Sequence, residues 1–177
     1  VNGEILDNKI TEMPTDRFTG LKKVWDAGLS EGHSLYDWYM REWAGVDSAT
    51  GAGLWNLYYD DANANGVYDS SDAPISNMAL YMDANPTANV KSTTTNNYAQ
   101  ATQKYVGKSA IPKLRGAFRL NSAYKNFDFT AQFSYNIGGH VYDNGYAQLM
   151  DNGDLIGANN WHNDIKDAWK QPGDVTN

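Results

Sequence analysis

The amino-acid sequence predicts an all-β fold, and three of its features lead to this prediction. Residues 116–139 alternate apolar and polar side chains on both sides of a break at Lys125 and Asn126, and period-two alternation is typical of a strand with two different faces. Two aromatic runs, 35–43 and 54–59, predict further strands. The segments between them are rich in Gly, Asn, Asp, Ser and Thr, which favour turns.

The break at Lys125 and Asn126 predicts a β-hairpin with one aromatic and one polar face. The apolar face takes Phe118, Leu120, Ser122 and Tyr124 from the first arm and Phe127, Phe129, Ala131, Phe133 and Tyr135 from the second. The polar face takes Arg119, Asn121, Ala123, Asp128, Thr130, Gln132 and Ser134. Each arm has the length, roughly 9–10 residues, of a tilted strand that crosses a bilayer. The same pattern also fits a hairpin of a soluble sandwich whose aromatic face covers a protein core.

The lengths of the connections favour a membrane barrel over a sandwich. Residues 60–110 are low in apolar content and predict one long loop, which is unusual inside a compact soluble domain. Membrane barrels carry long loops on their outer face and short turns on the other, and the break at Lys125 and Asn126 would be such a short turn. Farther on, the spacing of Trp161, Ile165, Ala168 and Trp169 predicts a short amphipathic helix within a second loop.

Composition excludes several classes of protein. The chain has 177 residues, no cysteine and a net charge of −7, which excludes a disulfide scaffold and thiol metal sites and makes nucleic acid an unsuitable partner. The sequence contains no apolar run long enough for a transmembrane helix. It begins without methionine and ends without a closing strand, and we interpret it as a piece of a longer polypeptide.

Residues 61–72 (DANANGVYDSSD) have the spacing of a calcium-binding loop. Oxygen donors fall at the loop positions that calcium loops use, with Gly66 at the sharp turn. The expected ligands are Asp61, Asn63, Asn65, the backbone carbonyl of Val67, Asp69 and Asp72. The last ligand is Asp rather than the usual Glu, and amphipathic helices do not flank the loop. The pattern therefore predicts a possible Ca²⁺ site, and the alternative is a turn that binds no metal.

The sequence carries no pattern that predicts an enzyme. The three histidines, His33, His140 and His162, are far apart, and the motifs of hydrolases, phosphate-binding loops and dinucleotide-binding folds do not occur. The aromatic side chains expected to be exposed could stack on a sugar ring or a partner, or pack against one another. They are Trp38, Tyr39, Trp43, Trp55, Tyr58 and Tyr59.

Several segments, taken in order, resemble the SusC/RagA family of TonB-dependent outer-membrane transporters of the Bacteroidetes. These are residues 44–51 (AGVDSATG, with Ser48 where proline is common), the loop at 60–72, residues 105–113 (YVGKSAIPK), the aromatic hairpin with 141–143 (VYD) after it, and residues 168–174 (AWKQPGD). The resemblance covers about residues 33–177 and depends on the order and spacing of the segments.

The resemblance implies the late, C-terminal strands and long extracellular loops of an antiparallel outer-membrane β-barrel of about 22 strands. Residues 1–177 would be part of one barrel domain, in which 33–115 are mostly extracellular loops, 116–137 a transmembrane hairpin and 138–177 an extracellular loop. The side chains expected to face lipid are Phe118, Leu120, Phe127, Phe129 and Phe133. Those expected to contact ligand or a lid protein are Trp38, Tyr39, Trp43 and Trp55.

The function implied is that of part of a TonB-dependent transporter in the bacterial outer membrane, which imports oligosaccharides or peptides together with a SusD-like surface lipoprotein. Its partners would be the rest of the barrel, that lipoprotein, the lipid membrane and, through upstream segments, TonB. The alternative is a soluble, calcium-stabilised all-β module that binds carbohydrate through exposed aromatics. A secreted glycosidase domain would require a pair of carboxylates in a cleft.

Overall fold

A computed structural model describes residues 1–20, 28–150 and 160–174, which form mostly strands with a few short helices. The chain divides into two compact units. The hairpin unit comprises Val1–Tyr39 and Tyr105–Val141, and the second unit comprises Met40–Lys104 and Tyr142–Asn177. Among the described residues, no helix is both long enough and apolar enough to cross a membrane. The all-β prediction is confirmed, and within the described ranges the strands form separate small sheets without a closed barrel.

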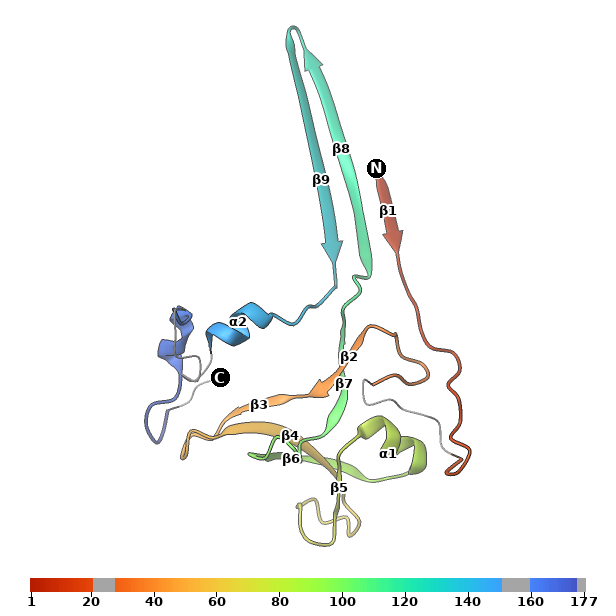
Figure 1. Cartoon of the computed structure of the whole chain (residues 1–177), viewed down its shortest axis with the longest axis vertical. Helices are drawn as coiled ribbons and strands as arrows, with labels where there is room; N and C mark the ends of the chain where they lie inside the picture. Colours follow the sequence, from red (N-terminus) through yellow and green to blue (C-terminus); the bar gives the residue numbers. More distant parts are fainter. Residues whose placement is uncertain (21–27, 151–159, 175–177) are drawn as a thin grey trace. The chain divides into compact units, whose positions relative to one another are not determined.

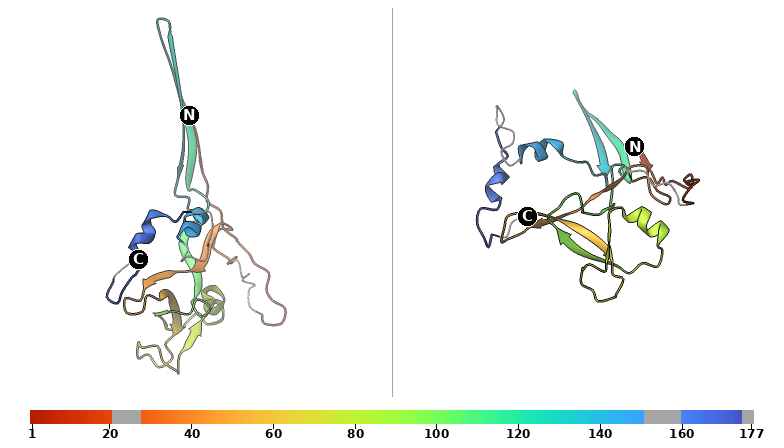
Figure 2. Two further views of the ribbon diagram at one scale, coloured as in Figure 1. Left: turned by 60° about the vertical axis from the view of Figure 1, so that its left-hand side comes forward. Right: turned by 60° about the horizontal axis from the view of Figure 1, so that its bottom comes forward.

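The hairpin unit is built on a three-stranded antiparallel sheet in the order β1–β8–β9 (Figure 1). Strands β8 (Leu114–Tyr124) and β9 (Phe127–Ile137) pair over their whole length of 11 residues each. Strand β1 (Asn2–Ile5) pairs only with the first four residues of β8. The remaining part of the hairpin is a two-stranded ribbon, as the two views in Figure 2 show. The predicted hairpin is therefore confirmed.

The register of β8 and β9 gathers the apolar side chains on one face. Phe118 lies opposite Phe133 with the two rings stacked at 4.8 Å, and Tyr124 lies opposite Phe127. In the described structure Phe129 is 61% exposed and Phe133 47% exposed. Burying a large apolar side chain is worth about 1.5–3 kcal/mol, so this face strongly favours an apolar environment.

The two ends of the sheet differ in their connections. Ile5 pairs with Leu114, and Leu114 pairs with Ile137. The end of β1, the start of β8 and the end of β9 therefore lie at the same end of the sheet. The long segments 6–113 and 138–177 therefore both join the sheet at that end. The other end carries only the two-residue turn, in which Lys125 has a φ of 53°. Left-handed φ values favour glycine and asparagine, so Lys125 holds a strained conformation.

Strands β2 (Asp37–Arg41) and β7 (Gln103–Ser109) pair with each other and carry the chain between the two units. The sequence predicts one strand over 35–43, whereas the structure has β2 and then, after Glu42, a separate strand β3 (Trp43–Val46).

The second unit is organised around β4 (Gly53–Asp60), which pairs with β3, β5 (Ala73–Ile75) and β6 (Val90–Thr95). Its core consists of Leu57, Tyr59, Ile75 and Ala101. The buried Thr102 hydroxyl accepts from the Tyr58 amide and donates to the Ile75 carbonyl. One side chain therefore satisfies backbone groups on both β4 and β5.

The prediction of one long loop over 60–110 is wrong, because this segment contains β5, α1 (Met78–Ala84), β6 and β7. These elements are short, and β6 reads VKSTTT, which has no apolar alternation to reveal a strand. Tyr59, expected to be exposed, is buried in the core. The position of segment 33–115 outside a membrane stays a prediction.

The predicted second loop, 138–177, contains α2 (Asn144–Leu149) and a short 3₁₀-helix, η1 (Asn163–Asp167). Residues 151–159 and 175–177 of that loop lie outside the described residues. The helix predicted from the spacing of Trp161 to Trp169 is shorter than expected, and both tryptophans flank it.

Candidate functional site

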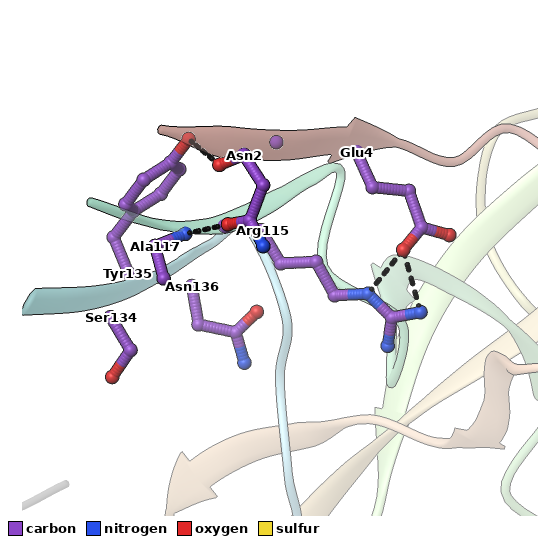
Figure 3. Close-up of a pocket in the computed structure, with 9 residues that line it drawn as sticks. Asn2, Glu4, Arg115, Ala117, Ser134, Tyr135 and Asn136 are labelled. Carbon is purple, nitrogen blue, oxygen red and sulfur yellow. Dashed lines mark hydrogen bonds and ion pairs between the residues drawn. The ribbon is translucent and has the colours of Figure 1, made fainter. Parts of the chain in front are cut away.

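The polar face of the sheet carries a shallow pocket where β1 joins β8, with a volume of about 640 Å³. Figure 3 shows the Arg115 guanidinium directed at the Glu4 carboxylate, with Nε and Nη2 each 2.9 Å from Oε2. The Asn2 side chain accepts from the Ala117 amide at 2.8 Å. Both charged side chains are about half exposed, so the ion pair contributes on the order of 0–1 kcal/mol. The ion pair helps fix the register of β1 and adds little to the stability of the sheet.

The apolar face of the same sheet has a close contact at Gly116. Tyr135 of β9 lies opposite Gly116, and its hydroxyl donates to the Asn2 carbonyl of β1 at 3.4 Å. A Cβ atom at Gly116 would lie 2.4 Å from both the Tyr135 hydroxyl and the Asn2 carbonyl oxygen. The absence of a side chain at Gly116 thus lets Tyr135 span three strands.

The second unit presents a row of aromatic side chains. Trp43 and Trp55 lie opposite each other on β3 and β4, with ring centroids 5.4 Å apart and nearly perpendicular planes. Tyr98 packs edge-on against Trp55, also at 5.4 Å, and the Arg41 guanidinium lies 4.7 Å above the Tyr98 ring. Edge-to-face pairs of this kind are favourable beyond the area that they bury.

A third tryptophan joins this row from the far end of the chain. The Ser48 carbonyl accepts from the Trp169 indole at 3.1 Å and from the Gly173 amide at 2.8 Å. Gly51 has a φ of 76°, and a Cβ there would lie 2.4 Å from the Trp169 ring. The segment 168–174 therefore docks on the turn at 44–51, and a groove of about 1090 Å³ lies beside Trp43, Trp55 and Trp169.

The structure brings together two of the four aromatic residues expected to contact ligand. Trp43 and Trp55 share the groove, whereas Trp38 and Tyr39 lie in the hairpin unit. There the Trp38 indole donates to the His140 carbonyl, and Tyr39 packs edge-on against Tyr105. Trp169 and Tyr146 also line the groove, and the sequence did not assign them to a site. Gly51 packs against Trp169, which lies more than a hundred residues away, so no local pattern predicts this contact.

The predicted calcium loop is closed by hydrogen bonds to its own amides. The buried Asp61 carboxylate accepts from the Asn65 amide at 3.0 Å and the Gly66 amide at 2.9 Å. Asp72 accepts from the Asp69 amide at 2.9 Å. Within the described residues, no three acidic or histidine side chains gather in an arrangement that could hold a metal. The Ca²⁺ site stays a prediction.

The Asp69 carboxylate accepts several hydrogen bonds from within this loop. The side chain and then the amide of Ser71 donate to its Oδ1 atom, and the Asn65 side chain donates to Oδ2. These hydrogen bonds favour the charged form and lower the pKa of Asp69 to about 2.

This shift predicts that the loop loosens in acid. A depressed carboxyl pKa stabilises the folded loop above the ordinary Asp value of about 3.9. The stabilisation is lost as the pH falls through about 2. Hydrogen exchange over 61–72 should show protection that declines between these two pH values in the wild type. In Asp69→Asn the decline over that interval should be smaller, because this carboxylate no longer takes up a proton. An equal decline in both proteins would contradict the prediction.

No family model matches the chain, and no curated protein matches it. Among solved structures, the chain is similar to one described as the structure of the RagAB peptide transporter, with a TM-score of 0.55 and 22% identity. The match covers 95% of this chain and 16% of that chain. The chain therefore has a fold similar to part of that transporter, with low sequence identity, and spans about one sixth of its length.

Proposed function

We propose that the chain is part of an outer-membrane transporter and that the β8–β9 hairpin crosses the membrane as two strands of its barrel. The observation that carries the proposal is the hairpin itself. Each strand has 11 residues, the length that spans a bilayer when tilted. One face is mostly apolar and largely exposed, and the other is mostly polar, as in barrel strands between lipid and a wet lumen.

The positions of the connections support one orientation. Outer-membrane barrels have short turns on the periplasmic side and long loops outside. The two-residue turn at Lys125 and Asn126 would be periplasmic, and the segments 6–113 and 138–177 would be extracellular. The open edges of β1 and β9 would pair with further strands of the same barrel, since an unpaired edge is not viable in lipid.

The cargo and partners follow from the family resemblance. We propose import of oligosaccharides or peptides together with a SusD-like surface lipoprotein, driven through TonB, and no catalytic role for this part of the protein. The fold likeness to a peptide transporter supports the transport function.

The orientation can be tested by labelling cells that express the full-length protein. The chain itself has no cysteine. In a full-length protein whose cysteines outside the chain, if any, have been replaced, single cysteines can be placed at Val67 in a loop of the second unit and at Lys125 in the hairpin turn. A membrane-impermeant maleimide should label Val67→Cys on intact cells and Lys125→Cys only after the outer membrane is permeabilised. Labelling of both positions on intact cells would contradict the proposal.

We also propose that residues 61–72 bind one Ca²⁺ ion that orders the loop, with weak, extracellular-type affinity of roughly 10⁻⁴–10⁻³ M. The spacing of oxygen donors and Gly66 supports this. Calorimetric titration of the full-length protein with calcium chloride should detect this site. Asp61→Asn should weaken calcium binding, whereas Asp128→Asn on the hairpin should not. Equal calcium affinity in both variants would contradict the site.

A further inference from the structure

We propose that the groove of the second unit binds a neutral saccharide chain, which stacks on Trp43 and hydrogen-bonds to Asp164 and Asp167. This inference names the substrate class of the proposed transporter. It rests on that proposed function, because the groove would be the site where the substrate is captured. It is drawn from three properties of the groove: its tryptophans, its carboxylate wall and the shape of the neighbouring strand.

Three of the six tryptophans of the chain line this one groove. Two glycines make room for them. A Cβ at Gly53 would lie 2.8 Å from the Trp43 ring and 3.1 Å from the Trp55 ring, and a Cβ at Gly51 would lie 2.4 Å from Trp169. Trp43 nevertheless remains 50% exposed. A half-exposed indole of this kind can stack on the apolar C–H face of a pyranose ring.

Other residues that line the groove supply acceptors for hydroxyl groups. The Tyr146 hydroxyl donates to Asp164 Oδ2 at 3.1 Å, and Asp164 and Asp167 both line the groove. The hydrogen bond to Asp164, burial and the charges of both carboxylates raise the pKa of Tyr146, so Tyr146 keeps its proton and stays a donor. Carboxylates accept hydrogen bonds from pairs of sugar hydroxyls. The groove also contains Lys166, Lys170 and a third acid, Asp174. Two positive charges thus face three negative ones, and this near balance favours a neutral ligand.

The neighbouring strand disfavours an extended peptide. Peptides commonly bind by adding a strand to an exposed sheet edge, and β3 is the edge strand beside this groove. It has only four residues, with a register shift between Trp43 and Gly45. Gly45 has a φ of 110°. Bulges of this kind interrupt edge pairing, so a saccharide fits the groove better than a peptide.

The test is calorimetric titration of the full-length protein in detergent with three neutral hexasaccharides (maltohexaose, cellohexaose and xylohexaose) and, separately, with a tryptic digest of casein. At least one hexasaccharide should bind. Trp43→Ala should weaken that binding by about tenfold or more, as expected when a stacking partner is removed. Asp167→Asn, which keeps the shape of the side chain, should weaken it by about threefold through the loss of a charged acceptor.

The matched control is Trp161→Ala, because Trp161 is 55% exposed and does not line the groove. Its affinity for the hexasaccharide should equal that of the wild type. The proposal is overturned if none of the three hexasaccharides binds, or if Trp43→Ala and Trp161→Ala bind equally well. Binding of casein peptides alone, lost in Trp43→Ala, would assign the groove to peptides instead.

A second readout on the same samples separates this inference from the proposed function. Heat-modifiable migration on a gel reports assembly of a membrane barrel. Saccharide binding that depends on Trp43, by a protein without heat-modifiable migration, would overturn the proposed function and leave the groove assignment standing. Heat-modifiable migration without saccharide binding would overturn the groove assignment and leave the proposed function standing.

Discussion

Replacing Phe133 with arginine is expected to destabilise the membrane-inserted protein by about 2–4 kcal/mol, the cost of a cation near the bilayer midplane. Phe133 lies close to the middle of β9 and stacks on Phe118 of β8. Loss of that aromatic pair would add about 0.5–1.5 kcal/mol. Phe129 lies nearer the turn, so Phe129→Arg should cost less than Phe133→Arg. The measurement is the free energy of unfolding of the full-length protein in lipid vesicles.

The matched control is Gln132→Arg, one residue earlier and on the opposite face. An arginine there would face the wet lumen of the proposed barrel and should change the free energy of unfolding by little. Similar costs at both positions would mean that the two faces do not have different surroundings. A harmless Phe133→Arg would mean that the apolar face does not meet lipid.

Replacing Gly116 with alanine is expected to destabilise the sheet by about 1–3 kcal/mol, the usual cost of overpacking. The added Cβ would lie 2.4 Å from the Asn2 carbonyl oxygen, and a backbone atom cannot move aside as a flexible side chain can. It would also meet the Tyr135 hydroxyl at 2.4 Å. The strand most affected should be β1, which has only four paired residues. Amide exchange of β1 should therefore accelerate more than that of β9.

Gly145→Ala is the control for this substitution, because the same Cβ there meets only one atom at 3.4 Å, an ordinary contact. Gly145 lies in α2, where alanine is favoured over glycine by roughly 0.5–1 kcal/mol. It should leave the stability unchanged or raise it slightly. If Gly116→Ala were equally harmless, the packing of Tyr135 across three strands would not hold.

The sequence predicted the local parts of the fold and missed the distant pairings. The β8–β9 hairpin was predictable because Phe127, Phe129 and Phe133 alternate with polar residues around a two-residue turn. The pairing of β1 with β8 joins residues more than a hundred positions apart. The packing of Tyr135 on Gly116, which accompanies this pairing, has no local signature. The strands within 60–110 were missed for a related reason, since β6 is polar and is defined by its pairing with β4.

Of the two candidate sites, the calcium loop could be predicted from local sequence and the groove could not. The spacing of donors at 61–72 is local and visible in the sequence. The groove is not, because its walls come from the turn after Val46 and from the segment around Trp169. Trp43 and Trp55 were singled out as aromatic candidates, but their convergence with Trp169 depends on Gly51 and Gly53. A glycine in a turn has many possible causes, so its role became visible only with its neighbours.

The most direct test of the membrane hairpin is a spin-label scan of β9 in the full-length protein reconstituted in lipid vesicles. Single cysteines at 129–135 would carry a nitroxide, and collisions with oxygen, which concentrates in lipid, and with a water-soluble nickel chelate would be measured. The odd-numbered positions, which include Phe129, Phe133 and Tyr135, should show high oxygen and low nickel accessibility, and the even-numbered positions should not. Odd-numbered positions shielded from both reagents would place this face in a protein core and contradict the barrel.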